Sequence, residues 1–203
     1  METDQYKTLK KPSKQVLFKD RNSKFYGQAF PVQKEKEVKL ILEELKNQHP
    51  TANHHCYAFK LGIEERNLIY RSNDDGEPNN SAGKPILGQI EGFGLTNVIV
   101  VVVRYFGGTK LGVGGLIQAY KNTAQLTLEQ SEIVTRTIMV QLKLRFDYDL
   151  MNDIMKLIRE ENLNIISNDS GLKCNLIISF RQSQYNHIKE LLEKFQNLEQ
   201  SIL

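Results

Sequence analysis

The chain has 203 residues, of which 40% are hydrophobic and 25% charged, and its formal net charge is +3. These values are ordinary for a soluble globular protein. No apolar run approaches the roughly 20 residues of a membrane helix, and the amino terminus lacks the apolar segment of a secretory signal. Because only Cys56 and Cys174 occur, we expect a cytoplasmic protein without a disulfide framework.

Positive charge is concentrated near the amino terminus. Residues 1–26 contain seven basic and three acidic side chains, and the whole excess of positive charge lies within residues 1–132. A local basic patch attracts nucleic acid, although a solvated amino-terminal arm explains the same composition.

The first 130 residues alternate between extended and helical patterns. Strands are expected at residues 15–19 and 24–32, and two more at His55–Leu61 and Asn67–Tyr70. Between the second and third strands, a helix has apolar residues at the i, i+3, i+4, i+7 spacing, namely Val38, Ile41, Leu42 and Leu45. A further helix is predicted from Pro85 to about Phe93.

A β-branched run, Val98–Val103, predicts a strand that is buried on both faces of a sheet. The helix after it has one apolar face, formed by Ile117, Tyr120, Ala124 and Leu128. Strand, polar loop and helix therefore occur twice in succession, which predicts an α/β or α+β sandwich.

The pattern changes near residue 132. Apolar residues alternate along Ile138–Phe146, and a helix face follows at Met151, Ile154, Met155 and Ile158. A hairpin of residues 163–167 and 172–180 then precedes a last helix at Ile188–Phe195. This β-α-β-β-α order fits a ferredoxin-like plait, which a short final strand would close. We expect an α+β protein of two domains, residues 1–132 and 133–203.

Five of the thirteen glycines lie in the segment Arg104–Gly115, directly after the β-branched strand. A loop that feeds a helix here could cradle an anion on its free N–H groups. Alternatively, the glycines allow a tight turn. The segment matches neither the P-loop nor the dinucleotide-binding pattern. The candidate anion-binding residues are Lys84, Arg104, Gly107, Gly108, Lys110, Gly112, Gly114 and Gly115.

A second loop contains three carboxylates, Asp74, Asp75 and Glu77. They could hold Mg²⁺ beside a bound phosphate, or they could form a turn by bonding their own backbone. If the two strand-loop-helix units run parallel, both loops leave the sheet at the same edge, where ligand sites usually form.

The triplet His54-His55-Cys56 carries reactive residue types, but no further zinc ligands stand at a suitable spacing. A packed cysteine beside histidines at a strand end is the better interpretation. No catalytic residue is assigned, and a non-catalytic protein is favoured over an enzyme.

Three segments together resemble the signature of the IMPACT family, in its bacterial YigZ-like form. They are HPTANHHCYAFKLG, SNDDGEPNNSAGKPIL and VVVVRYFGGTKLGVGGLIQAY. The resemblance covers roughly residues 15–130, and the carboxy-terminal part resembles the small plait domain that bacterial members append.

The resemblance implies a first domain folded like the RNA-associated units of a small-subunit ribosomal protein and of domain IV of elongation factor G. It implies a second domain like that factor's ferredoxin-like module. Eukaryotic members regulate translation by restraining activation of a starvation-responsive kinase, with an additional amino-terminal interaction domain. We therefore expect a translation-associated regulatory protein that binds RNA or ribosomal components. The alternatives are a magnesium-dependent enzyme acting on a phosphorylated small molecule or nucleotide, and a protein-interaction module.

The chain departs from the family pattern at three places. Asn79–Gly83 stands where the family usually reads Ser-Gly-Thr-Ala-Gly, Val103 replaces a usual threonine, and Gln118 replaces a usual arginine. Losing that arginine removes one cation from a phosphate-binding surface.

Overall fold

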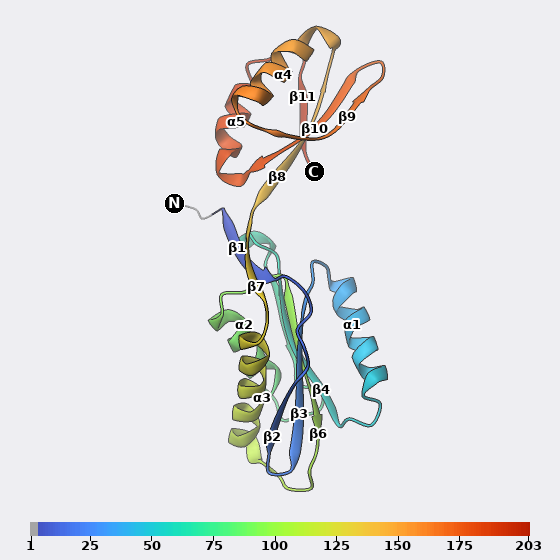
Figure 1. Cartoon of the computed structure of the whole chain (residues 1–203), viewed down its shortest axis with the longest axis vertical. Coiled ribbons are helices and arrows are strands. Elements are labelled where there is room, and N and C mark those ends of the chain that lie inside the picture. Colours follow the sequence, from blue (N-terminus) through green and yellow to red (C-terminus); the bar gives the residue numbers. More distant parts are fainter. Residues whose placement is uncertain (1–3) are drawn as a thin grey trace. The chain divides into compact units, whose positions relative to one another are not determined.

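The computed structural model describes residues 4–203, apart from the side chain of Glu65. The described chain forms two compact units, one of Tyr6–Arg136 and one of residues 4–5 with Thr137–Leu203. Each unit is mixed α/β and built on antiparallel sheets (Figure 1).

The first unit is a five-stranded sheet with helices on both faces (Figure 1). In spatial order its strands are β2 (Val16–Asp20), β3 (Ser23–Pro31), β6 (Val98–Tyr105), β4 (His54–Leu61) and β5 (Ile69–Asn73). Helices α2 (Gly83–Gly92) and α3 (Gly112–Glu129) cover one face, and α1 (Glu35–Gln48) covers the other. Every neighbouring pair in this sheet is antiparallel.

Strand β6 is the centre of this unit because its side chains alternate between two cores. Val100 and Val102 join the cluster under α2 and α3, while Ile99 and Val101 join the cluster under α1. The prediction of a strand buried on both faces is confirmed.

Helix α3 differs from the predicted face by one position. Leu116 is buried, whereas Ile117 is 38% exposed. Tyr120, Ala124 and Leu128 are fully buried, as expected.

Two short strands were not predicted. β1 (Gln5–Leu9) pairs with β7 (Ile133–Thr137), and the predicted boundary at residue 132 had separated these segments. Lys10 and Lys11, just after β1, contact Glu132 at 2.6 and 3.3 Å, so this part of the basic arm is paired with a carboxylate.

The second unit has one four-stranded sheet with two helices. Its spatial order is β11 (Glu199–Ile202), β8 (Met139–Phe146), β10 (Cys174–Arg181) and β9 (Asn164–Ser170). Leu142, Leu144 and Phe146 of β8 pack in one core with α4 (Met151–Glu160) and α5 (Tyr185–Leu192). The expected closing strand is present, and the hairpin turn lies three residues later than predicted, because β9 continues to Ser170.

Candidate functional site

The glycine-rich loop and the acidic loop meet at one end of the five-stranded sheet. β5 and β6 are each antiparallel to β4, which lies between them, so they run in the same direction and end at the same edge. Glu77 of the acidic loop contacts Arg104 at the end of β6, with 2.6 Å between Oε1 and Nη1. The expected convergence of the two loops is confirmed.

Arg104 lies inside this junction and not on its surface. Its side chain is 6% exposed and that of Glu77 is 4% exposed. The guanidinium carbon lies 5.5 Å from the ring centre of Phe25 and 5.4 Å from that of Phe106. The charge is therefore committed to Glu77 and two aromatic rings, which corrects the expectation that Arg104 reaches a phosphate.

A chain of polar side chains continues from Glu77 into the core. The Tyr120 hydroxyl donates to Glu77 Oε1 at 2.7 Å. Cys56 Sγ lies 3.3 Å from that hydroxyl and 3.1 Å from the Asp74 carbonyl oxygen. Sequence patterns marked Tyr120 only as an apolar helix position, and nothing in its spacing indicated a partner 43 residues away.

Burial raises the pKa of the Cys56 thiol and of the Tyr120 hydroxyl above their ordinary values. Both groups are therefore protonated near neutral pH and act as hydrogen-bond donors. A thiol in this state is a poor nucleophile, which agrees with the interpretation of Cys56 as a packed cysteine.

The aspartates of the acidic loop hold its backbone in place. Asp74 Oδ1 accepts hydrogen bonds from the N–H groups of Ala82 and Gly83 at 2.9 and 2.8 Å, at the start of α2. Asp74 Oδ2 accepts from the N–H of Asn80 at 2.8 Å. Asp75 Oδ2 accepts from the N–H of His55 at 2.6 Å. Among the side chains of residues 4–203 other than Glu65, no three of His, Cys, Asp or Glu are placed to hold a metal ion.

The glycines of the other loop have different roles. Gly108 and Gly112 have φ angles of +86° and +74°, which glycine adopts without strain. Gly107 packs directly on the backbone of Asn22, and its N–H donates to Ser23 Oγ at 3.2 Å. The packing around Gly114 leaves room for a larger residue, because no atom would lie within 4 Å of a Cβ at this position.

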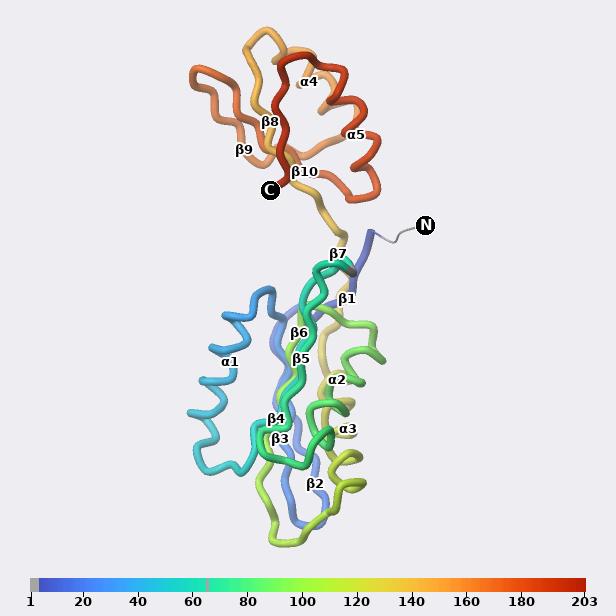
Figure 2. Tube along the Cα trace, turned by 180° about the vertical axis from the view of Figure 1, so that it is seen from behind, coloured from blue at the N-terminus to red at the C-terminus, as the bar shows by residue number. Residues whose placement is uncertain are grey.

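Lysines surround this end of the sheet. Lys84 is exposed in the first turn of α2, and Lys110 is exposed just before α3. Lys19 and Lys24 face each other across the β2–β3 hairpin, and Asn22 at the tip of this hairpin lies against Gly107. The hairpin ends beside the loop that follows β6 (Figure 2). Among the residues that the structure describes, none of these four lysines has an ion-pair partner. The structure thus keeps Lys84 and Lys110 as surface cations beside the loops.

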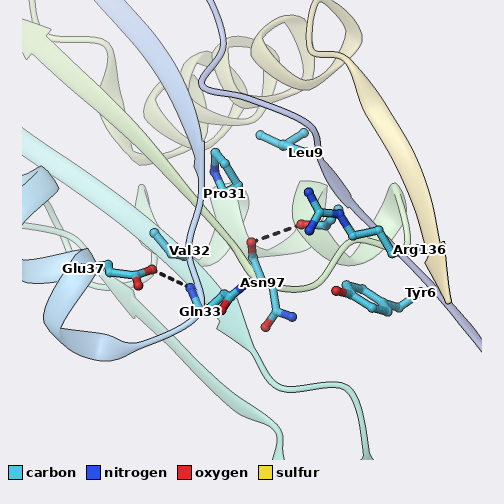
Figure 3. A pocket seen from close by; sticks show the side chains of 9 residues that line it. Tyr6, Leu9, Pro31, Val32, Gln33, Glu37, Asn97 and Arg136 are labelled. Carbon is cyan, nitrogen blue, oxygen red and sulfur yellow. Dashed lines mark hydrogen bonds between the residues drawn. The ribbon is translucent and has the colours of Figure 1, made fainter. Parts of the chain in front are cut away.

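A separate pocket of about 400 Å³ lies at the opposite end of the sheet, near the start of β6 (Figure 3). Within it, Thr8 Oγ1 donates to the Asn97 carbonyl oxygen at 3.2 Å, and the N–H of Gln33 donates to Glu37 Oε2 at 2.7 Å. It contains none of the predicted site residues.

Two histidines near the site are expected to make the free energy of unfolding depend on pH. Burial lowers the pKa of His49 below the ordinary 6.5, and burial is also the main cause that lowers the pKa of His55. As pH falls through 6.5, the unfolded chain therefore takes up protons that the folded chain resists. We expect urea unfolding to show a free energy that decreases from pH 7 to about pH 5. The slope should be shallower in the variant His49→Asn, His55→Asn, and an unchanged slope would contradict this assignment.

Comparison with known proteins gives a consistent set of relatives. The sequence model described as the Impact N-terminal domain matches residues 21–128. An IMPACT family member of Haemophilus influenzae is 34% identical over 189 residues, covering 90% of both chains. The IMPACT family member YigZ of Escherichia coli is 36% identical over 132 residues, covering 65% of both chains. A crystal structure of a hypothetical protein matches with a TM-score of 0.72 at 27% identity, covering 98% of this chain and 97% of its own.

Within the described residues, no helix is long and apolar enough to cross a membrane.

Proposed function

This chain belongs to the IMPACT family, and from that premise we propose that it is a cytoplasmic, non-catalytic regulator of translation that binds RNA or ribosomal components. The link to translation follows from the eukaryotic members of the family. The RNA-binding surface is the end of the five-stranded sheet at which the two loops converge.

The surface cations carry this proposal. Lys19, Lys24, Lys84 and Lys110 come from three separate segments at the same end of the five-stranded sheet, and none has an ion-pair partner in the described chain. Arg104 and Glu77 cancel each other beneath them, so the exposed charge is that of the lysines. Lysines of this kind bind phosphates and give affinity that depends on salt and little on sequence.

The backbone of the glycine-rich loop adds N–H donors at the same place. The first turn of α3, from Gly112 to Gly115, has N–H groups without helical partners. Such groups favour an anion. These glycines, with Gly107 and Gly108, are proposed to shape the loop so that a phosphate reaches its backbone.

The finer fold assignments belong to the same proposal. The spatial order β11-β8-β10-β9 places the fourth, first, third and second strands of the second unit side by side, with both helices in one core. This arrangement supports a ferredoxin-like plait. The helix-covered sheet of the first unit supports a fold of the type seen in ribosomal proteins and in domain IV of elongation factor G.

The magnesium-dependent alternative gains no support from the contacts. Asp74 already accepts three backbone hydrogen bonds, and Glu77 is paired with Arg104 and Tyr120. Only Asp75 combines a single backbone hydrogen bond with an exposed side chain, 37% accessible. We therefore propose structural roles for all three carboxylates.

The variant Lys110→Ala tests the surface. Losing one phosphate contact should weaken binding to structured RNA several-fold and reduce the slope of log affinity against log salt by about 0.7–1. Fluorescence anisotropy across a salt series measures both quantities. Lys36→Ala is the matched control, because Lys36 is an exposed lysine at the start of α1 and outside this surface. RNA binding that is absent or insensitive to salt would refute the proposed function.

A further inference from the structure

Beside the glycine-rich loop, on the α1 side of the sheet, the first unit has a pocket of about 380 Å³. We call it the aromatic pocket. It is lined by Asn22, Lys24, Tyr26, His49, Tyr105 and Phe106. Its volume is within the range of small-molecule binding sites. Phe106 is also the first residue of the loop that follows β6, so the pocket and the proposed RNA surface are continuous.

Three rings that contact one another form one wall of this pocket. The rings of Tyr26 and Tyr105 are perpendicular, with centroids 5.8 Å apart, and the His49 ring lies 5.6 Å from that of Tyr26. His49 Nδ1 is 2.9 Å from the Tyr105 hydroxyl, and its Nε2 is 3.1 Å from the Gln15 amide nitrogen. Both imidazole nitrogens therefore have partners, which fixes the orientation of the wall.

Phe106 is an exposed aromatic residue that is nevertheless held in place. The residue is 43% exposed. Its N–H donates to Asn53 Oδ1 at 2.8 Å, and its ring lies 5.4 Å from the buried guanidinium of Arg104. The buried ion pair therefore positions an aromatic face at the rim of the pocket.

The side chains that line the pocket indicate which kind of ligand it fits. Lys24 lines it, and its lining among the described residues includes no carboxylate. Fixed aromatic rings stack on flat π-systems, an amide such as that of Asn22 can bond the edge of a base, and a lysine neutralises a phosphate. An apolar peptide side chain would need the rings but neither the amide nor the cation.

We propose that the aromatic pocket receives an unpaired base of single-stranded RNA, with the flanking phosphates against Lys24 and Lys110. This inference rests on the proposed function and names the form of RNA that the surface prefers. A base within a duplex cannot enter the pocket, because its faces are already stacked on neighbouring bases.

Two ring-removing variants test the inference. Phe106→Leu and Tyr26→Leu keep an apolar side chain but lose the stacking face. Each should weaken binding to a short single-stranded RNA about tenfold and leave binding to a duplex RNA unchanged. Lys110→Ala should weaken binding to both RNAs. The matched control is Tyr70→Leu, because Tyr70 is 59% exposed on β5 and outside the pocket. Thermal unfolding of each variant verifies that it folds.

The outcomes separate this inference from the proposed function. If the ring variants bind single-stranded RNA like the wild type while Lys110→Ala weakens it, the proposed function stands and the aromatic pocket is not a base site. If the wild type binds neither RNA, both proposals fail. A titration with adenosine monophosphate, followed by the NMR shifts of the Phe106 amide and the His49 ring, tests whether the pocket binds a free nucleotide instead of an RNA strand. Saturation by the nucleotide at a lower concentration than by the strand would overturn the proposed occupant.

Discussion

Replacing Glu77 by alanine is expected to lower the free energy of unfolding by about 3–5 kcal/mol. The substitution leaves the Arg104 guanidinium charged and buried, since its side chain is only 6% exposed. It also removes the acceptor of the Tyr120 hydroxyl. Urea unfolding followed by circular dichroism measures the change as a lower midpoint at a similar dependence on urea.

Two further variants show whether the ion pair causes that loss. Glu35→Gln removes an exposed contact with Arg71 and should leave the midpoint close to that of the wild type. The double variant Glu77→Ala, Arg104→Ala should lose less stability than the two single losses added together, because neither charge then remains buried alone. Strict additivity would contradict a coupled pair.

Gly107→Ala is the second substitution with a large expected effect. A Cβ at this position would overlap the backbone of Asn22 and Ser23, which cannot move aside as a flexible side chain would. The loop must then separate from the β2–β3 hairpin. We expect a loss of about 1–3 kcal/mol in the free energy of unfolding, together with weaker RNA binding because the loop no longer lies beside Lys24.

Gly114→Ala is the matched control in the same segment. No atom lies within 4 Å of a Cβ built there, and its φ is not in the left-handed region. Alanine in α3 should therefore raise the free energy of unfolding by about 0.5–1 kcal/mol. Similar effects of the two substitutions in urea unfolding would contradict the packing assigned to Gly107.

The buried polar chain connects the two loops through the interior of the first unit. Cys56, Tyr120, Glu77 and Arg104 come from four different segments and meet between the two loops. Each side chain is buried and has at least one hydrogen-bond partner, as buried polar groups require, although the Arg104 Nε atom itself has none. The junction therefore holds the loops in position, with the lysines on the surface around them.

Local periodicity predicted most of the elements. The run Val98–Val103 and the helices α1 and α3 follow patterns that depend only on neighbouring residues, and all three appear in the structure, although the buried face of α3 includes Leu116 and not Ile117. β1 and β7 were missed because their pairing joins segments more than 120 residues apart, as the contact of Lys10 with Glu132 illustrates. Neither strand has an alternation strong enough to be recognised alone.

By itself the sequence determined the family and most of the helices and strands, since these depend on local patterns, and it predicted the approach of the two loops from strand direction. Only the tertiary structure decided which way Arg104 points and which side chains surround it. A guanidinium can bind a phosphate at the protein surface or a carboxylate in the interior. Which of the two Arg104 contacts depends on Glu77, 27 residues away in the chain. The aromatic pocket likewise exists only where Tyr26, His49 and Tyr105 meet, because stacking surfaces are formed by packing and not by spacing along the chain.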